Sequence, residues 1–456
     1  MGSGKTPGWL MRTALIAVWV VVLVCLFLNA ARRVGGDTGD FVHFYEAARA
    51  MLHGEDLYSS GRGGYIYPPL LAFLYTPVAV LPPNAAAVVL LLCNMVLMLA
   101  SVLLAAREFA RRFGIRTDAW KTLAVALAAS LLVGDKLKGE LQMWQTNLLM
   151  LFLFTAALAL LDRRPILAGM VLGVAFNIKY LPIVFLPYLL LRRRWTAAAA
   201  FAASIVGFAL LPAVLTGWGA NLHNQTIAYS GLFRLMGVPV GTARAANIHG
   251  IAADFSVSIP SGVARSVGAG DSAGLALAAA GVVALAAAAV AGWMYRRNDV
   301  PFLYRPDSLY TCPGPINAIA GLEWAVLVAA ALVFSPQTNT RHLSLLLIVQ
   351  TPAVLLLSSP APGVSRRPLL FGTAVLVFGL LFPPGTQDFI QVIGIWFAGP
   401  LEVWRSVGGP CWCALAMLGA LIWTGLPYAR SLNAALVAPG ADATRLVSLS
   451  RRGAAA

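Results

Sequence analysis

The chain has 456 residues, of which 59% are hydrophobic and 11% are charged, and its mean hydropathy is +0.78. Soluble domains average about 45–50% apolar residues, so this composition excludes a soluble globular protein and predicts an integral membrane protein. The formal charge of +15 would suggest nucleic acid as the partner of a soluble protein. In a membrane protein, lysine and arginine instead gather on the cytoplasmic side, so we expect a lipid bilayer and no nucleic acid as partner.

Apolar runs recur along the chain, and a run of about 20 residues can cross roughly 30 Å of hydrocarbon as a helix. The first run follows the basic residues Lys5 and Arg12 and is expected to be an uncleaved first span. The predicted runs lie at about 13–31, 84–106, 120–134, 141–161, 166–191, 195–215, 272–294, 317–334, 343–358, 368–383 and 410–428. The sequence therefore predicts an all-α integral membrane protein.

The run at 166–191 decides the predicted topology. It lies between Arg163–Arg164 and Arg192–Arg193–Arg194, two basic clusters that the positive-inside rule places on the same face. One continuous span would hold Lys179 at the bilayer centre, at a cost of about 3 kcal/mol on insertion scales. Two short spans that meet at Lys179 on the outer side avoid both problems, and they would cover 166–178 and 181–191. We therefore predict a bundle of about twelve transmembrane helices with both termini in the cytoplasm.

This topology places most lysines and arginines in the cytoplasm and leaves the outer face nearly neutral, as the positive-inside rule requires. The unusual polar segments then collect on the outer face, which is where we expect the active site. The expected organisation is a single transmembrane domain, 1–456, in the plasma membrane. Its expected parts are an outer catalytic loop at 32–83, a long outer loop at 216–271 and a cytoplasmic tail at 429–456.

The segment Gly36–Pro69 concentrates acidic residues in a chain that elsewhere avoids charge. Within it, Asp40–Leu52 carries apolar residues at helical spacing and is followed by Gly54, which predicts an amphipathic interfacial helix that stops there. The carboxylate of Asp40 is either an N-cap, which contributes about 1 kcal/mol, or a general base, which contributes about 10² to 10⁴ in rate. Asp37 is the rival candidate for the second role.

Cationic side chains that border the outer face are candidates for binding an anionic ligand. Lys179 either binds an anion or is a snorkelling lysine at an interfacial turn. Arg341 and His342 follow the polar segment SPQTNT, and they either anchor the next span or bind a phosphate group.

Several uncharged residues are candidates for substrate contact, and each has a structural alternative. Gln145 and Asn147 enter a predicted span, where amides can also hold helices together. Tyr67 lies in the aromatic and proline-rich segment YIYPP, which is equally typical of an interfacial aromatic belt. Both interpretations stay open from the sequence alone.

The loop at 216–271 supplies further candidates. Asn224 and Gln225 belong to a formal glycosylation sequon, and Arg234 follows them in the same loop. Glu323 stands near the inner end of a predicted span, where we expect it to pair with a buried donor. The histidines and cysteines show no metal-ligand spacing and the carboxylates form no cluster, so we expect no metal and no cofactor.

Taken in chain order, these motifs resemble glycosyltransferase family 87, a family of membrane mannosyltransferases of the GT-C fold, over about residues 36 to 345. The matching motifs are Asp40-Phe41, Leu57-Tyr58, Tyr67-Pro68-Pro69, Trp144-Gln145-Thr146-Asn147, Ile178-Lys179-Tyr180-Leu181-Pro182, Asn224-Gln225-Thr226, Ser335-Pro336 and Arg341-His342. Trp144 departs from the glycine that is usual at the first position of the fourth motif. The motifs are weak individually and fairly specific as an ordered set.

The resemblance implies a GT-C bundle that transfers mannose from polyprenyl-phosphate-mannose to a glycolipid or glycan acceptor on the outer face, with inversion. An α-1,2 transfer of the phosphatidylinositol mannoside type is the nearest activity it implies. The family's catalytic aspartate corresponds to Asp40, and its late outer-loop histidine is similar to His342. Lys179 and Arg341 would then help to bind the donor phosphate.

Two alternatives stay open. One is a lipid-phosphate-sugar transferase of the same fold with another sugar or acceptor. The other is a lipid or sugar transporter, or a flippase, which would need functional charges that are accessible from both sides of the membrane. The predicted collection of such charges on one face favours an enzyme.

Overall fold

The computed structural model describes residues 8–36, 38–59, 64–235, 249–268, 273–300, 313–359, 363–381 and 402–437. Helices make up nearly all of the ordered structure, and within these ranges extended pairing is limited to one bridge, between Ser256 and Asn339. The helices are α1 (Gly8–Ala31), α2 (Phe41–His53), α3 (Pro69–Ala79), α4 (Pro83–Arg112), α5 (Ala119–Leu132), α6 (Gly134–Gln142), α7 (Asn147–Leu160), α8 (Pro165–Phe176), α9 (Phe185–Leu191), α10 (Trp195–Leu210), α11 (Ala213–Thr216), α12 (Trp218–Leu235), α13 (Ile259–Ser266), α14 (Ala273–Arg297), α15 (Pro313–Phe334), α16 (Leu347–Ser358), α17 (Arg367–Leu381) and α19 (Gly409–Val437), with 3₁₀ turns η1 (Leu181–Val184) and η2 (Thr340–Leu346).

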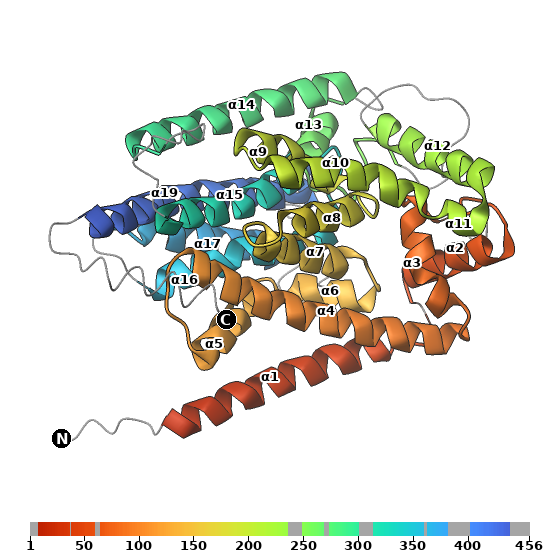
Figure 1. The fold of residues 1–456 in the computed structure, drawn as a ribbon, viewed down its shortest axis with the longest axis horizontal. Coiled ribbons are helices and arrows are strands. Elements are labelled where there is room, and N and C mark those ends of the chain that lie inside the picture. The colour runs from red at the N-terminus through yellow and green to blue at the C-terminus, as the bar shows by residue number, and fades with distance from the viewer. Residues whose placement is uncertain are drawn as a thin grey trace.

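The long helices lie roughly along the longest axis of the molecule, and α1 and α14 form its two opposite edges (Figure 1). Seven of the described helices are long and apolar enough to cross a membrane, and several shorter apolar helices accompany them. Large apolar side chains of α1 and α14 are exposed, which is the normal state of a surface that faces lipid. The expectation of an all-α membrane protein is confirmed, while the number of about twelve spans stays a prediction.

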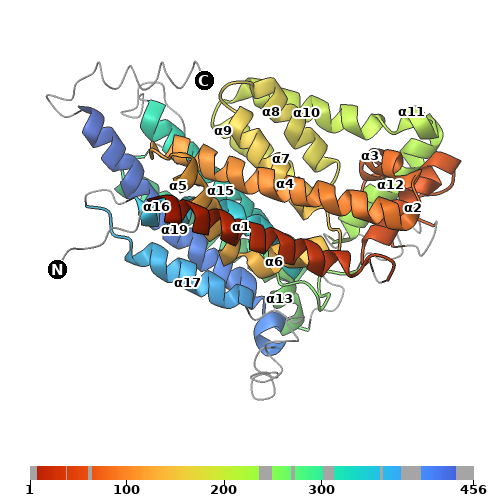
Figure 2. The ribbon, with the colours of Figure 1, turned by 90° about the horizontal axis from the view of Figure 1, so that it is seen from below.

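The helices α2, α3, α11 and α12 gather at one end of the bundle in both views (Figures 1 and 2). α2 packs on α3, and α12 packs on α11 and α3. The expected outer loops therefore contain helices: α2 and α3 lie within 32–83, and α12 and α13 lie within 216–271. The predicted helix that begins after Asp40 and stops at Gly54 is confirmed as α2.

The predicted break in the run 166–191 is also confirmed. α8 ends at Phe176, and a turn that contains Lys179 leads into η1 and α9. Gly169 and Gly173 let α8 pack closely against α10, since a Cβ atom at either position would lie about 2.4 Å from an α10 atom. The segment thus forms two short helices, with Lys179 at the turn between them.

The run expected at 141–161 begins later than predicted. α6 ends at Gln142, and α7 begins only at Asn147, after a turn in which Trp144 adopts φ 49°. The turn forms because the Glu140 carboxylate accepts the backbone N–H of Asn147 at 3.2 Å and thereby caps α7. Gln145 consequently lies in the turn before α7, and Asn147 is the first residue of α7.

The last helix also differs from expectation. α19 continues from Gly409 to Val437, beyond residue 428, where the predicted last span ended and the cytoplasmic tail was expected to begin. Tyr428 fixes this extension, because its hydroxyl donates to the Phe113 carbonyl at 2.9 Å. Residues 438–456 of the expected tail lie outside the described residues.

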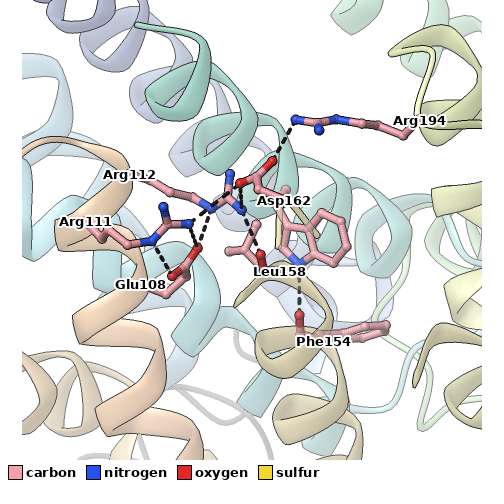
Figure 3. A network of polar contacts seen from close by, with 8 residues as sticks. Glu108, Arg111, Arg112, Phe154, Leu158, Asp162 and Arg194 are labelled. Atoms are coloured by element: carbon pink, nitrogen blue, oxygen red, sulfur yellow. Dashed lines mark hydrogen bonds and ion pairs between the residues drawn. The ribbon is translucent and has the colours of Figure 1, made fainter. Parts of the chain in front are cut away.

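At the other end of the bundle, charged side chains from three segments form a network that we call the arginine cluster (Figure 3). Its members are Glu108, Arg111, Arg112, Asp162 and Arg194. The fully buried Arg112 lies 2.7 Å from Glu108 and 2.8 Å from Asp162, and it also donates to the Leu158 carbonyl. Arg194 reaches Asp162 at 2.7 Å, so the basic clusters on both sides of the 166–191 run lie at the same end, as predicted.

Other contacts bring the chain's basic segments to this same end. The guanidinium of Arg12 lies 5.2 Å above the ring of Trp120, which follows α4 by a short turn. Arg430, in the extension of α19, pairs with Asp299 at 2.9 Å.

The sequence predicts that Glu323 pairs with a buried donor. Glu323 receives hydrogen bonds from Arg192 and from the Tyr295 hydroxyl, which confirms that prediction.

Candidate active site

Asp40 stands at the first position before α2. Its backbone is helical, with φ −77° and ψ −10°, and its side chain makes no capping hydrogen bond to the helix. The interpretation of Asp40 as an N-cap side chain is therefore wrong, since a capping residue needs an extended backbone and an oxygen turned toward the first free N–H groups. The carboxylate instead makes a contact outside its own helix, with Arg341.

α2 is held firmly by its apolar face. Phe41 and Phe44 are almost fully buried, and the Phe41 ring lies 6.2 Å from the Trp144 ring. The Tyr45 hydroxyl donates to the Leu81 carbonyl at 2.7 Å, and Gly54 closes the helix with φ 73°, a conformation that favours glycine. These contacts fix the start of α2, and hence Asp40, against the α6–α7 turn.

Trp144 shapes this turn. It occupies the left-handed region at φ 49°, which is uncommon for a bulky residue and is stabilised only by its surroundings. The indole is 1% exposed, and its Nε1–H donates to the Ala87 carbonyl at 2.8 Å. The resembled family usually has glycine at this position, and the left-handed backbone observed here is one that favours glycine. In this chain the burial of the Trp144 side chain stabilises the same backbone conformation.

Arg341 reaches Asp40 from the far end of the sequence. Its Nη1 lies 3.5 Å from Asp40 Oδ2, and both side chains are about one third exposed. This is a long and accessible ion pair, so its net contribution to stability is small. The pair places an accessible carboxylate beside an accessible cation.

The segment before Arg341 is anchored by hydroxyl groups. The Ser256 hydroxyl accepts the backbone N–H of Thr338 at 3.0 Å, and Val257 N–H donates to the Thr338 carbonyl at 2.7 Å. Asn339 then caps the N-terminus of η2. The His342 ring completes a capping box, because its Nδ1 accepts the Asn339 backbone N–H at 3.2 Å. In a neutral His342 ring the proton therefore lies on Nε2, which makes that atom the donor.

Lys179 meets the same region through Asn147. Its Nζ donates to Asn147 Oδ1 at 2.5 Å, and Asn147 Nδ2 donates to Glu140 Oε1 at 2.8 Å. The antiparallel packing of α7 and α8 brings the end of α8 beside the start of α7. A carboxylate and an ammonium are thus linked by one buried amide.

Tyr67 lies over this group. Its ring is 5.6 Å from Lys179 Nζ, which is a cation–π distance, and its hydroxyl is 3.4 Å from Gln145 Oε1. Burial raises the pKa of Tyr67, and the charges of Asp40 and Glu140 raise it further. One tyrosine therefore lies within electrostatic range of both carboxylates.

We define the candidate active site by its members, which come from six separate segments: Asp40, Tyr67, Glu140, Gln145, Asn147, Lys179, Arg341 and His342. Burial raises the pKa of Glu140, and the charge of Lys179 opposes this shift. Burial lowers the pKa of Lys179, and Glu140 and Asp40 oppose that shift. The site therefore contains groups that can change charge near neutral pH.

The other sequence candidates are not brought into this group. Gln225 Nε2 donates to the Ala209 carbonyl at 2.8 Å, so this amide ties α12 to α10. Asn224 is buried in the same helix, which approaches the site through the ring contact of Tyr229 with Tyr180, at 5.6 Å. Arg234 lies in the last turn of α12, where it forms no salt bridge with any described residue. Asp37 lies outside the described residues.

Glu140 is the member that the sequence did not single out. It lies in the polar segment DKLKGELQMWQTN, among other charged residues, and nothing local distinguishes it from Asp135. The available signal was its position seven residues before Asn147, at the boundary with an apolar run.

Among the described residues, no group of three or more histidine, cysteine, aspartate or glutamate side chains could hold a metal ion.

Residues 65–310, more than half of the chain, match the family model described as glycosyltransferase family 87. The chain is also similar to proteins named polyprenol-phosphate-mannose-dependent alpha-(1-2)-phosphatidylinositol mannoside mannosyltransferase. The one from Mycobacterium tuberculosis is 29% identical over 228 residues, which are 42% of this chain and 50% of the relative. The one from Mycolicibacterium smegmatis is 31% identical over 183 residues, which are 36% of this chain and 41% of the relative. The chain thus matches half or less of the length of each of these relatives.

Proposed function

The chain belongs to glycosyltransferase family 87, and from that premise we propose that it transfers mannose from polyprenyl-phosphate-mannose to a glycolipid or glycan acceptor. The names of the relatives support this donor, and they suggest a phosphatidylinositol mannoside as acceptor and an α-1,2 linkage. The observation that carries the proposal is the convergence of Asp40 with Arg341 and Lys179. An accessible base beside two cations suits the transfer of a sugar from a phosphate.

In the proposed reaction, Asp40 is the general base that takes the proton of the acceptor hydroxyl. The hydroxyl oxygen forms a bond to the anomeric carbon of mannose while the bond from that carbon to the phosphate oxygen breaks. The bonding electrons leave with the phosphate, and the sugar carbon inverts. A single displacement needs one base and no carboxylate nucleophile, and a positioned base contributes about 10² to 10⁴ in rate.

The departing lipid phosphate gains negative charge during this step. Lys179 and Arg341 can stabilise that charge by charge-assisted hydrogen bonds, and His342 can add the Nε2–H of its neutral ring. These groups come from the α8–η1 turn and from η2, so the fold itself sets their spacing. Such preorganised cations act most strongly where charge develops.

The remaining candidates are proposed to contact substrate. Tyr67, Gln145 and Asn147 lie beside Lys179, which suits contact with the mannosyl phosphate. Asn224, Gln225, Arg234 and Asp37 are proposed to contact substrate farther from the reacting carbon. No metal or other cofactor is part of this proposal.

We further propose that the active site faces the exterior of the plasma membrane and that both termini are cytoplasmic. Gly8 begins α1 and Val437 ends α19, and contacts of Arg12 and Tyr428 bring both helices to the end that carries the arginine cluster. The positive-inside rule assigns that end to the cytoplasm. Labelling a single cysteine at position 179 from each side of sealed membranes tests this orientation, which a signal restricted to the cytoplasmic side would overturn.

The function is tested by transfer of radiolabelled mannose from polyprenyl-phosphate-mannose to lipid acceptors in membranes that contain the protein. Asp40→Asn is expected to lose about 10²-fold to 10⁴-fold in transfer rate while it still binds the donor, because only the base is removed. Asp37→Asn is the matched control and is expected to change the rate modestly at most. Equal activity of Asp40→Asn and the unaltered protein would refute the assignment of the base.

A panel of lipid-linked sugars separates the two alternatives from this proposal. Transfer from a donor with another sugar, without transfer from polyprenyl-phosphate-mannose, would indicate a different transferase of the family. Movement of a lipid-linked sugar across the membrane without a new glycosidic bond would indicate a flippase.

A further inference from the structure

Glu140 is the most deeply placed charge of the candidate active site. Its side chain is fully buried on α6, whereas Asp40 is about one third exposed. A buried carboxylate is costly unless hydrogen bonds and an opposite charge compensate it. Asn147 supplies two N–H groups, one from the backbone and one from the side chain, and Lys179 supplies the charge beyond it.

The orientation of the Asn147 amide is determined by its two neighbours. An ionised carboxylate only accepts hydrogen bonds and an ammonium only donates them. The amide nitrogen must therefore face Glu140 and the amide oxygen must face Lys179, which is the arrangement observed. Glu140 thus sets the direction of the oxygen that receives the lysine.

The amide also keeps the two charges apart. In the arginine cluster, Arg112 contacts its carboxylates directly, at 2.7 and 2.8 Å. Among the residues that the structure describes, Lys179 instead donates to one amide oxygen, and this leaves N–H groups of the ammonium for another acceptor. The charge of Glu140 still acts on Lys179 through the amide. This arrangement suits a cation that must bind and release an anionic ligand.

We infer that Glu140 is a positioning residue, which through Asn147 orients Lys179 and keeps it charged where the phosphate of a lipid-linked substrate binds. The inference rests on the proposed function for the identity of that phosphate. It adds a residue that supports the phosphate site without touching the substrate. The consequence is that phosphate binding depends on the charge of Glu140.

The electrostatics of the surrounding groups support this role. Burial lowers the pKa of Lys179 to about 8, and Glu140 is the charge that raises it most. Asp40 raises it as well and Arg341 lowers it, while His342 and Tyr67 also face this region. On α6 itself, Lys136 and Asp135 pair with each other at 2.8 Å. Removal of the Glu140 charge therefore lowers the pH at which Lys179 becomes neutral.

The test compares Glu140→Gln with the unaltered protein in binding of a polyprenyl monophosphate, in detergent, from pH 6 to pH 9. Glutamine keeps the size of the side chain and one of the two oxygens that accept N–H groups of Asn147, but it carries no charge. In Glu140→Gln, we expect the pH at which half of the binding is lost to fall by about one unit. Binding at pH 8 then becomes roughly five-fold weaker than in the unaltered protein. At pH 6, where Lys179 is protonated in both proteins, Glu140→Gln is expected to bind at least as tightly.

Further variants keep the test decisive. Glu140→Asp retains the charge and is expected to retain the alkaline midpoint, and Lys179→Gln is expected to remove the alkaline transition in either background. An unchanged midpoint in a folded Glu140→Gln protein, or an equal weakening at every pH, would overturn the inference. Because this assay needs no sugar transfer, a protein that shows the shift but transfers no mannose would refute the proposed function alone.

Discussion

The arginine cluster and the candidate active site lie at opposite ends of α7, and both combine carboxylates with cations. The 14 residues of α7 separate them by about 20 Å, at roughly 1.5 Å per residue. In the arginine cluster, the fully buried Arg112 contacts two carboxylates and a carbonyl at 2.7–2.8 Å. In the candidate active site, Asp40 and Arg341 are 3.5 Å apart and partly exposed, and Lys179 meets its carboxylate only through an amide.

The difference shows how the same side-chain types serve two purposes. A buried cation in direct contact with its carboxylates holds helices together, and it is costly to disturb. Groups held near each other by intervening amides and long ion pairs can exchange these partners for a ligand. The comparison therefore predicts that substitutions in the arginine cluster change stability, whereas substitutions in the candidate active site change activity.

The largest effect on stability is expected for Arg112→Met, which leaves Glu108 and Asp162 without their buried partner. Breaking a buried pair costs about 3–5 kcal/mol, so the thermal unfolding midpoint in detergent should fall sharply. Arg111→Met is the matched control, because Arg111 is one third exposed and should cost much less. Equal losses for the two variants, or a comparable loss for Asp40→Asn, would remove the distinction between the clusters.

The next largest effect is expected for Lys179→Gln, which removes a cation from the proposed phosphate site. A hydrogen bond to a charged group contributes about 1.5–3 kcal/mol, so binding of polyprenyl phosphate should weaken roughly 10-fold to 100-fold. The unfolding midpoint should fall less than for Arg112→Met, since Lys179 meets the buried Glu140 carboxylate through the Asn147 amide and not by direct contact. Lys138→Gln, on α6, serves as control and should bind like the unaltered protein.

A rise in pH should affect the candidate active site but not the arginine cluster. The pKa of Lys179 is lowered to about 8, so its positive charge is lost as the pH rises through that value. Mannose transfer should therefore decline several-fold between pH 7 and pH 9. The unfolding midpoint should hold over the same range, because the arginines keep their charge. A parallel decline of both quantities would mean that the site does not titrate independently of the fold.

The smallest effect is expected for Arg430→Ala. Its pair with Asp299 lies at the same end as the arginine cluster, but both side chains are more than half exposed. Exposed pairs contribute about 0–1 kcal/mol, so the unfolding midpoint should shift by a small fraction of the Arg112→Met effect. A large fall of the unfolding midpoint would mean that the contribution of a charge to stability depends on its location at this end of the bundle and not on its burial.

Features that depend on neighbouring residues were predictable from the sequence. The helix after Asp40 and its stop at Gly54 follow from apolar spacing and from the preference of glycine for a left-handed backbone. The break at Lys179 follows from the cost of a charge in the bilayer and from the basic clusters at both ends of that run. Both predictions are confirmed because each depends on a local pattern.

Features that depend on packing were not predictable in this way. The start of α7 at Asn147, rather than at 141, depends on a hydrogen bond to Glu140, which the hydrophobic pattern does not show. The extension of α19 past residue 428 depends on the contact of Tyr428 with Phe113, which is distant in sequence. In each case a tertiary contact outweighs the local signal.

The sequence by itself determined that this is an all-α membrane protein of glycosyltransferase family 87, and it supplied most members of the candidate active site. It did so because lipid solvation, helical periodicity and charge placement act on each segment separately. Only the tertiary structure placed Arg341 against Asp40, 301 residues away, and revealed Glu140 behind Asn147 and Lys179. Those contacts depend on how α6, α7, α8 and η2 pack, because hydrogen bonds and ion pairs require atoms within a few ångströms of each other.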